Sequence, residues 1–350
     1  MIEENSFTWQ EIVSQPDVWQ ATLAAFDASQ DALRGFLSDV TPAETLVIGC
    51  GSTHYLARAA APLLARATQR PSWAVPSSEL MLFGDALPLS KPLLIAVSRS
   101  GATTETLWAL DHYRETWHQP VLGVTCYPDS PMAGKADFVL AATEAQEHSI
   151  AQTRSFVSMY ILVQATAATM AGDGTFLARL NRLPQTLRVL SDQLGDLPRS
   201  LGADLDLERF FFLGGGPYYG LACEAMLKMK EMTLSYSEAF HPMEFRHGPM
   251  SMVNDQTLVI GFISDSAAMQ EVRVLQDMSE LGARTLAIVE DAQVFEGWQP
   301  DHVIELRSGL DEWARGALYL PPLQRMAYHR AVAKGLNPDT PTNLEAVVRL

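Results

Sequence analysis

The sequence predicts an α/β protein built from two tandem domains, each a parallel sheet flanked by helices. The first observation is a repeated succession of strand, tight turn and helix, as in "TLVIGCGS" followed by "YLARAAAPLLARA". The second is that this succession recurs at a nearly constant offset. Gly49 recurs as Gly214 after 165 residues and Ser98 as Ser264 after 166, and a third unit repeats after 164. We therefore infer an internal duplication of one domain.

Four segments are expected along the chain. Residues 1–40 carry apolar residues at helical spacing and should form an N-terminal helical segment. The first domain covers 41–190 and the second 191–335, and their joint near 180–205 has the pattern of a helix and a linker. The tail, 336–350, is rich in proline and asparagine and is expected to pack as an ordered extended segment near the active site.

The strands of the first domain are apolar runs that end in glycine or hydroxyl-rich turns. "TLVIG" leads into "CGST", and "PLLIAV" ends at Val97 before a turn from Ser98 to Thr104 and a helix. "PVLGV" and "ADFVLAA" complete four strands. In the second domain "RFFFLGGG", "TLVIGF" and "TLAIV" repeat the first three. The turns therefore fall at the carboxyl ends of parallel strands, where ligands bind in open α/β sheets.

Composition narrows the range of partners. The 350 residues are 47% hydrophobic and 19% charged, which is typical of a globular protein, and the net charge is −16. An acidic surface argues against nucleic acid, because a phosphate backbone requires a basic patch. It leaves room for one small phosphorylated ligand held by N–H groups and hydroxyls. No apolar run approaches the ~18 residues of a membrane span, so no membrane partner is expected.

The cysteines and the N-terminal residues favour a cytoplasmic protein without metal. Cys50, Cys126 and Cys223 are far apart and odd in number, and form neither a zinc spacing nor a disulfide framework. The opening "MIEENSFTWQEI" is acidic and lacks the apolar stretch of a signal peptide. No His or carboxylate spacing favours a metal site, His241 and Glu244 being the weak exception.

Two turns of the first domain could hold a phosphate. "GCGST" offers close backbone approach at Gly51 and the hydroxyl of Ser52. The hydroxyls of "SRSGATT" belong to Ser98, Ser100, Thr103 and Thr104. Hydroxyls and amides at a helix N-terminus suit a phosphate dianion, and simple helix capping is the alternative for either turn alone. In the second domain "SDSAAMQ" places Asp265 where it would repel phosphate, so one phosphate site is expected.

The helix "ACEAMLKMKEMTLSY" carries a charged stripe. Glu224, Lys228 and Glu231 are spaced by four and three residues, so they share one helical face. A solvated charged face is the alternative. Because the helix is otherwise apolar, the stripe more plausibly lines a cavity, where a carboxylate beside a lysine is a good general acid or base.

A second cluster follows in "SEAFHPMEFRHGPMSMV". His247 stands before Gly248-Pro249, which restricts the backbone and could orient the imidazole. A structural histidine is the alternative. The nearby Glu244 and Arg246 stay unassigned, and His241 could simply support the segment.

Five stretches carry a resemblance to a known family: "GCGSTHYLA", "SRSGATTETL", "IAQTRSF", "EAMLKMKEMTLSYSEAFHPMEFRHGP" and "KGLNPDTPTNLEAVV". In this order and over nearly the whole chain they resemble the sugar isomerase (SIS) domain proteins, specifically the isomerase half of glucosamine-6-phosphate synthase. The resemblance implies two tandem SIS domains of three-layer, flavodoxin-like type, and a sugar 6-phosphate as ligand.

The resemblance also implies residue roles. Phosphate would be bound by Ser98, Ser100 and Thr103, with Arg99 in the same turn and Gly51 and Ser52 nearby. Glu231 would move a proton between C1 and C2 of the open-chain sugar, and Glu224 and Lys228 would support it. His247 would serve ring opening and reach the partner's site in a homodimer. No metal or organic cofactor is implied.

Departures from the synthase make its reaction doubtful. Gln152 and Arg154 stand where the synthase has Ser and Lys, and Ala346 stands where it has its terminal lysine. The 350 residues hold no glutaminase domain, so glutamine is not expected as amide donor. The expected activity is that of a stand-alone hexosamine-6-phosphate deaminase/isomerase, which yields ketose 6-phosphate and ammonia. A fructosamine-6-phosphate deglycase and a non-catalytic sugar-phosphate-binding regulator are the alternatives.

Overall fold

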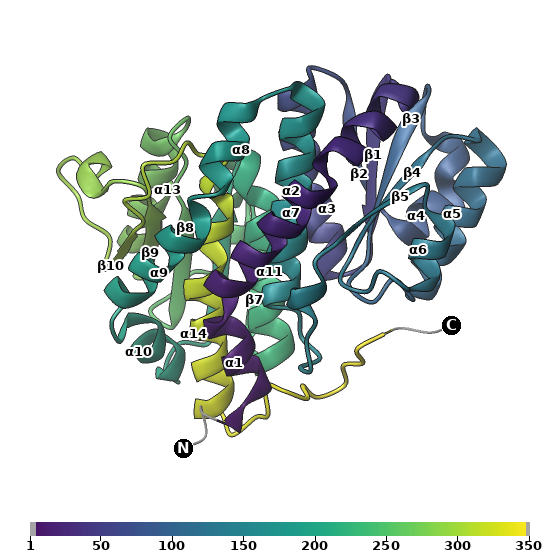
Figure 1. The fold of residues 1–350 in the computed structure, drawn as a ribbon. Helices are drawn as coiled ribbons and strands as arrows, with labels where there is room; N and C mark the ends of the chain where they lie inside the picture. Colours follow the sequence, from purple (N-terminus) through teal and green to yellow (C-terminus); the bar gives the residue numbers. More distant parts are fainter. Residues whose placement is uncertain (1–4, 348–350) are drawn as a thin grey trace. The chain divides into compact units, whose positions relative to one another are not determined.

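The computed structural model describes residues 5–347, which form two compact units (Figure 1). The first unit comprises residues 13–184 together with the tail from Glu345 onward. The second unit comprises 185–344 together with the N-terminal residues up to Ile12.

The first unit contains one parallel five-stranded sheet. Its strands are β1 (Glu44–Gly49), β2 (Ser72–Pro76), β3 (Pro92–Val97), β4 (Val121–Thr125) and β5 (Phe138–Ala141). They lie in the order β2-β1-β3-β4-β5, which is the flavodoxin-like order. The central β1, β3 and β4 are buried along their whole length because helices cover both faces.

Helices cover both faces of this sheet, so the unit has three layers with the sheet in the middle. They are α2 (Gln15–Val40), α3 (Ser52–Thr68), α4 (Ser77–Phe83), α5 (Thr104–Trp117), α6 (Pro131–Lys135), α7 (Arg154–Ala171) and α8 (Gly174–Leu180), with short 3-10 turns at Gly84–Ala86 and Thr143–Ala145. The helices α3 and α7 pack together on one face. On the other face α4, α5 and α6 bury Leu80, Leu110 and Met132 against Leu46 and Leu94 of the sheet.

The second unit repeats this architecture. Its strands are β6 (Arg209–Gly214), β7 (Tyr236–Phe240), β8 (Thr257–Phe262), β9 (Arg284–Val289) and β10 (His302–Glu305), all parallel. Their order, β7-β6-β8-β9-β10, is the order of the first sheet once the strands are matched in sequence. The predicted α/β fold with a duplicated parallel sheet is therefore confirmed.

The helices of the second unit also form two outer layers. They are α1 (Phe7–Val13), α9 (Leu183–Gln193), α10 (Leu197–Ala203), α11 (Tyr219–Thr233), α12 (Pro242–Phe245), α13 (Ala268–Glu280) and α14 (Leu320–Ala333), with 3-10 turns at Gly216–Tyr218, Pro249–Met252, Ala292–Val294 and Arg315–Tyr319. The helices α11 and α14 pack together on one face of the sheet. On the other face α12 and α13 bury Phe245, Val274 and Leu275 against Phe211 and Val259.

Three strands were not named from the sequence. β2, "SWAVP", was not among the four strands expected in the first domain, and β7 lies in the segment "YSEAF" that opens the histidine cluster. β10, "HVIE", was not among the three strands named in the second domain. All three are edge strands of their sheets. An edge strand is covered less completely than a central one, so it lacks the continuous apolar run that marks a buried parallel strand.

The N-terminal helix of the second unit is tied to a residue far along the chain. The carboxylate of Asp339 accepts hydrogen bonds from the N–H of Phe7 (3.0 Å), the N–H and hydroxyl of Thr8 (2.8 and 2.7 Å) and the hydroxyl of Ser6 (2.8 Å). These bonds lower the pKa of Asp339 although its partial burial acts in the opposite direction. A carboxylate at a helix N-terminus satisfies free N–H groups and the helix dipole. The segment around Asp339 therefore fixes the start of α1, which lies beside α14 (Figure 1).

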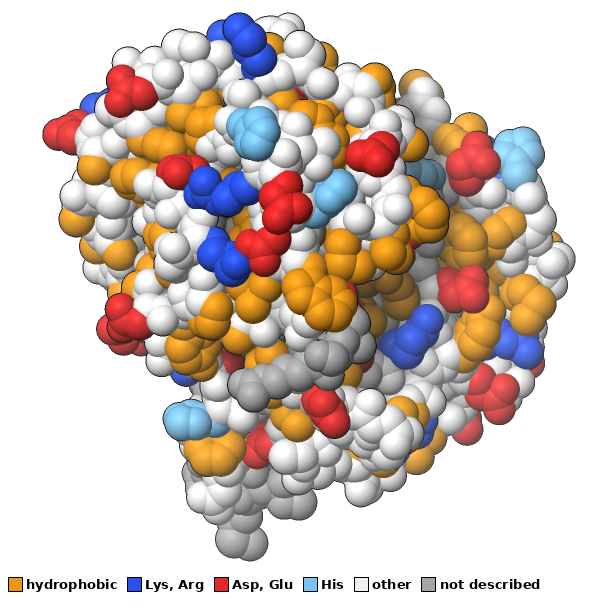
Figure 2. Space-filling view, turned by 90° about the vertical axis from the view of Figure 1, so that its right-hand side faces the viewer, with side chains coloured by type: hydrophobic (Ala, Val, Ile, Leu, Met, Phe, Trp, Pro, Cys, Tyr) orange, Lys and Arg blue, Asp and Glu red, His pale blue; other side chains and the backbone are white. Residues whose placement is uncertain are grey.

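Surface and apolar patterns agree with the composition. On the face drawn in Figure 2, acidic and basic side chains are interspersed with apolar ones and no extended basic patch is visible. Over residues 5–347 we find no helix long and apolar enough to cross a membrane.

Candidate active site

Three segments hold most of the predicted site residues. The glycine turn (residues 49–53) follows β1, and the serine loop (residues 98–103) follows β3, both in the first unit. The helix α11 belongs to the second unit. A fourth segment, the repeat loop (residues 264–267), follows β8 and is the duplicate of the serine loop.

The glycine turn is shaped by one glycine and one threonine. Gly51 has φ +56°, a left-handed conformation that glycine adopts without strain, and it precedes the first turn of α3. The N–H of Cys50 donates to Thr53 Oγ1 (2.9 Å), which donates in turn to the carbonyl of Cys50 (3.0 Å). Ser52 follows directly in the first turn of α3 and is buried. The turn thus brings backbone and a hydroxyl to the carboxyl end of β1, as predicted.

The next side chain of α3, His54, adds no positive charge at neutral pH. Burial, together with the nearby Arg58, lowers the pKa of His54 to about 4. Its Nδ1 is buried and has no hydrogen-bond partner within residues 5–347. A neutral imidazole here leaves the backbone and hydroxyls as the groups that could meet an anion.

The serine loop is held by its own side chains. The N–H of Gly101 donates to Ser98 Oγ (3.1 Å) and the N–H of Ala102 donates to Ser100 Oγ (3.2 Å). Thr103 precedes α5, and its hydroxyl lies 3.4 Å from that of Ser98. The hydroxyls of Ser98 and Thr103 therefore lie side by side where a helix begins, and Ser100 adds a third hydroxyl to the same loop; hydroxyls at a helix N-terminus suit a phosphate.

Backbone geometry makes the loop compact. Gly101 has φ +60°, and a Cβ at this position would lie 2.0 Å from Ser130 Oγ, so the loop requires glycine here. Within the described residues, no carboxylate accepts a hydrogen bond from the backbone N–H groups or the hydroxyls of the serine loop.

The guanidinium of Arg99 is buried, and its orientation is fixed by hydrogen bonds to a carboxylate and three backbone carbonyls. Its Nη1 lies 3.3 Å from Oε2 of Glu147 and donates to the carbonyls of Ser149 (3.4 Å) and Ile150 (2.9 Å). Its Nη2 donates to the carbonyl of Ala346 (3.0 Å). Arg99 therefore joins the serine loop to the segment before α7 and to the tail.

Glu147 is a buried carboxylate that sequence reasoning missed. Its side chain is 0% exposed. Besides Arg99 it accepts hydrogen bonds from the N–H and hydroxyl of Thr153 (2.7 and 2.9 Å) and from the N–H (3.1 Å) and hydroxyl of Ser155. These donors start α7, so Glu147 orders the stretch that contains Gln152. Gln152 Oε1 is buried and finds no partner in the described chain.

The charged stripe of α11 comes together as predicted. Lys228 Nζ lies 2.5 Å from Oε2 of Glu231 and 3.4 Å from Oε1 of Glu224. The side chains of Glu224 and Lys228 are 0% and 1% exposed, whereas that of Glu231 is 17% exposed. Buried charges need such pairing. The stripe is not a solvated face, and Glu231 is its accessible carboxylate.

His247 lies on an exposed segment between α12 and the 3-10 turn at Pro249–Met252. The following Gly248 has φ +123°, which agrees with the expected backbone restriction. Arg246, unassigned from sequence, forms an ion pair with Asp277 on α13. The ring of His241 stacks on Tyr219, with centroids 3.7 Å apart. Arg246 and His241 thus have structural partners within their own unit.

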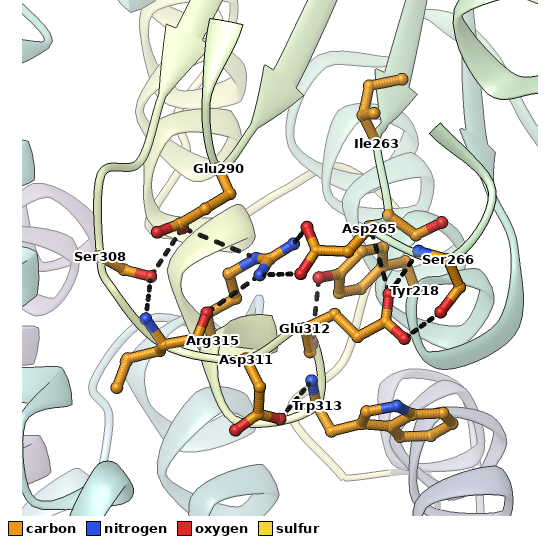
Figure 3. Close-up of polar contacts among 12 residues, drawn as sticks. Tyr218, Ile263, Asp265, Ser266, Glu290, Ser308, Asp311, Glu312, Trp313 and Arg315 are labelled. Atoms are coloured by element: carbon orange, nitrogen blue, oxygen red, sulfur yellow. Dashed lines mark hydrogen bonds and ion pairs between the residues drawn. The ribbon is translucent and has the colours of Figure 1, made fainter. Parts of the chain in front are cut away.

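The repeat loop of the second unit binds a carboxylate of its own chain (Figure 3). Oε2 of Glu312 accepts hydrogen bonds from the N–H groups of Asp265 and Ser266 (3.0 Å each), and Oε1 accepts the hydroxyl of Ser266. Glu271 Oε2 accepts the N–H (2.6 Å) and hydroxyl (2.9 Å) of Ser264. Burial raises the pKa of Glu271, against the effect of these bonds.

Charge repulsion by Asp265, the expected obstacle to phosphate, is offset by an ion pair. Arg315, which is 0% exposed, reaches both carboxylate oxygens of Asp265 (2.8 and 2.5 Å) and lies 3.7 Å from Oε2 of Glu290 (Figure 3). The repeat loop is instead occupied by Glu312.

We find no group of three or more His, Cys, Asp or Glu in residues 5–347 that could hold a metal ion.

Comparison with known proteins now identifies the domains. The SIS domain signature matches residues 43–169 and 206–334, one match in each unit. The chain belongs to the SIS domain family. Each SIS domain contains one of the two five-stranded sheets.

Individual relatives extend across nearly all of the chain. It is 27% identical to a glutamine–fructose-6-phosphate aminotransferase of Methanothermobacter thermautotrophicus, over 98% of this chain but 57% of that protein. It is 27% identical to AgaS of Escherichia coli K12, a candidate D-galactosamine-6-phosphate deaminase, over 99% of this chain and 94% of AgaS. A glucosamine-6-phosphate deaminase of Thermotoga maritima has 27% identity and a TM-score of 0.81, covering 99% of this chain and 100% of that one.

Proposed function

We propose that this SIS protein is an amino-sugar-phosphate isomerase/deaminase that converts glucosamine or galactosamine 6-phosphate to a ketose 6-phosphate and ammonia. The observation that carries the proposal is the triad on α11, in which buried Lys228 pairs with buried Glu224 and with the accessible Glu231. An accessible carboxylate oriented by a fixed ammonium is a suitable base for a carbon-bound proton. The similarity to a glucosamine-6-phosphate deaminase and to a candidate D-galactosamine-6-phosphate deaminase, each 27% identical over 99% of this chain, supports this choice.

The proposal assigns the phosphate to the serine loop. The phosphate would accept hydrogen bonds from the hydroxyls of Ser98, Ser100 and Thr103 and from N–H groups at the start of α5. Ser52 and the backbone of Gly51 would lie nearby. A dianion at a helix N-terminus is favoured by these donors and by the helix dipole.

Gln152 would contact the sugar. Its buried Oε1 lacks a partner within residues 5–347, and a substrate hydroxyl or amine would satisfy it.

The proposed chemistry needs only the substrate and water. Glu231 removes the proton from C2 of the open-chain amino sugar, and O1 takes up a proton, which gives an enaminol across C1 and C2. Glu231 returns its proton to C1, and C2 becomes an iminium. Water adds to C2 and ammonia leaves, which produces the ketose. Lys228 and Glu224 hold the Glu231 carboxylate in position during both transfers.

His247 is assigned to ring opening, acting in the site of a second copy of the chain. Its exposed position and the restricted backbone at Gly248 support this assignment. Mixing two inactive variants, Glu231→Gln and His247→Ala, tests it directly. Hybrid dimers with one intact site should recover up to roughly a quarter of the activity, since random pairing forms half hybrids. No recovery, or full activity of a dilute monomer, would remove the shared site.

A substrate panel tests the reaction. Ammonia release is measured from glucosamine 6-phosphate and galactosamine 6-phosphate, and amino-acid release from fructoselysine 6-phosphate. Glu231→Gln should lower kcat by ~10³-fold with little change in ligand affinity. Lys230→Gln, on the exposed side of α11, is the matched control and should keep activity. Amino-acid release alone would favour a deglycase, and binding without turnover of any substrate would favour a regulator.

A further inference from the structure

We propose that Arg99 is a positioning residue that holds the Glu147 carboxylate away from the serine loop and so keeps this loop open to phosphate. The inference rests on the proposed function, because it concerns the same loop. It comes from the comparison of the serine loop with its duplicate, where a glutamate of the chain sits on the loop itself.

Glu147 and Glu312 are duplicates of one another. They are 165 residues apart, which is the repeat offset, and each follows the last strand of its sheet. Their contacts differ. Glu312 accepts the N–H groups of Asp265 and Ser266 in the repeat loop, whereas Glu147 accepts donors at the start of α7 and the guanidinium of Arg99.

The residue that differs between the two loops accounts for the difference in contacts. Arg99 recurs as Asp265 after 166 residues, so the charge is reversed. In the first unit the glutamate gains a cation in Arg99, 3.3 Å away. In the second unit Asp265 takes the nearby Arg315, and Glu312 binds the free N–H groups instead. A carboxylate and a phosphate compete for such donors, because both are anions that accept them.

The guanidinium of Arg99 is well placed for this role. The carbonyls of Ser149, Ile150 and Ala346 fix its plane, so the Nη1 group that lies 3.3 Å from Glu147 is preorganised. Without Arg99, the buried carboxylate of Glu147 would lose its cation and would still lie next to the serine loop. Thr153 and Ser155 would still donate to it, but a buried charge without its counter-ion is costly, so the carboxylate should turn to the loop N–H groups, as Glu312 does.

A suppressor experiment tests the proposal. Binding of inorganic phosphate and of glucosamine 6-phosphate is measured by calorimetry for the wild type, Arg99→Met, Glu147→Gln and the double variant. Arg99→Met should weaken binding at least ~10-fold, as expected for displacing a charge-assisted contact, and raise KM more than it lowers kcat. The double variant should return to within ~3-fold of Glu147→Gln, because the competing charge is gone. Glu312→Gln is the matched control and should leave binding at this loop unchanged.

Other outcomes overturn the proposal. If Arg99 were a direct phosphate ligand, Glu147→Gln would not restore binding to Arg99→Met. If Arg99 acted by holding the tail, a chain ending at Leu344 would lose binding as Arg99→Met does, and the double variant would stay weak. If the double variant fails to fold by circular dichroism, Arg99→Met/Glu147→Ala carries the same test. Failure of the wild type to bind either probe refutes the proposed function itself.

Discussion

The serine loop and the repeat loop have the same internal turn but different occupants. In both, the N–H of the fourth residue donates to the hydroxyl of the first at 3.1 Å: Gly101 to Ser98, and Ala267 to Ser264. The repeat loop then binds Glu312, whereas no carboxylate of the described chain accepts a hydrogen bond from the backbone N–H groups or hydroxyls of the serine loop. The duplicated loops thus share one turn, and under the proposed function a few side chains decide which of them takes an external ligand.

The largest expected effect removes the hydroxyls from each loop. Under the proposed function, Ser98→Ala/Ser100→Ala/Thr103→Ala should lower kcat/KM by at least ~100-fold, since hydrogen bonds to a charged group contribute about 1.5–3 kcal/mol each. Ser264→Ala/Ser266→Ala should change kcat/KM less than ~3-fold, because Glu312 already occupies that loop.

Steady-state kinetics on the folded variants measures both. Equal losses of kcat/KM in the triple variant of the serine loop and the double variant of the repeat loop would show that the two loops are functionally alike. That result would contradict the comparison.

The second prediction exchanges the residue that shapes each turn. Gly101→Ala should cost about 3 kcal/mol of unfolding free energy, because a left-handed backbone and a contact of 2.0 Å with Ser130 would both be strained. The reverse change in the repeat loop, Ala267→Gly, should cost at most ~1 kcal/mol, since Ala267 has φ −131°. Urea unfolding of both variants measures the difference. A stable Gly101→Ala protein would contradict the close approach of Ser130.

The third prediction empties the repeat loop. Glu312→Ala should cost about 2 kcal/mol, because two N–H groups and a hydroxyl lose their acceptor. Formate or phosphate should then restore part of the lost melting temperature by taking the vacated position.

The control for this rescue is a variant already lacking the three serine-loop hydroxyls, so that anion binding to the first unit does not add to the signal. If anions stabilise this background equally with and without Glu312, the repeat loop does not retain anion-binding capacity.

The smallest expected effect is a pH dependence confined to the repeat loop. Burial raises the folded-state pKa of Glu271 above its ordinary value. A raised carboxyl pKa contributes stability below the unfolded-state value, and this contribution is lost as the pH rises through the folded-state value. The stability difference between wild type and Glu271→Gln should therefore move against the wild type as the pH rises above the ordinary carboxyl value of 4.5. A pH-independent difference in urea unfolding would contradict the shift.

The sequence was sufficient for the duplication and for the serine loop, because both depend on local signals. Apolar runs fixed β1 and β3, and the Ser/Thr/Gly turn marked the start of α5 at Thr104. The sequence was not sufficient to predict the contacts of Glu147 and Glu312, which join residues about 50 positions apart. Nothing in the pattern around a lone glutamate shows which donors it will meet. The repeat offset is the one signal that could have paired the two residues.

The hydrogen bonds between Asp339 and the start of α1 have a consequence for how the chain folds during its synthesis. The N-terminal helix belongs to the second unit, yet its anchor is made 331 residues later in translation. The sheet and most helices of the first unit lie within residues 13–184 and can assemble while the ribosome is still working. The helix α1 is therefore secured only after the 331 residues between Thr8 and Asp339 have been synthesised. We expect α1 to stay protease-sensitive in nascent chains until residue 339 has left the exit tunnel.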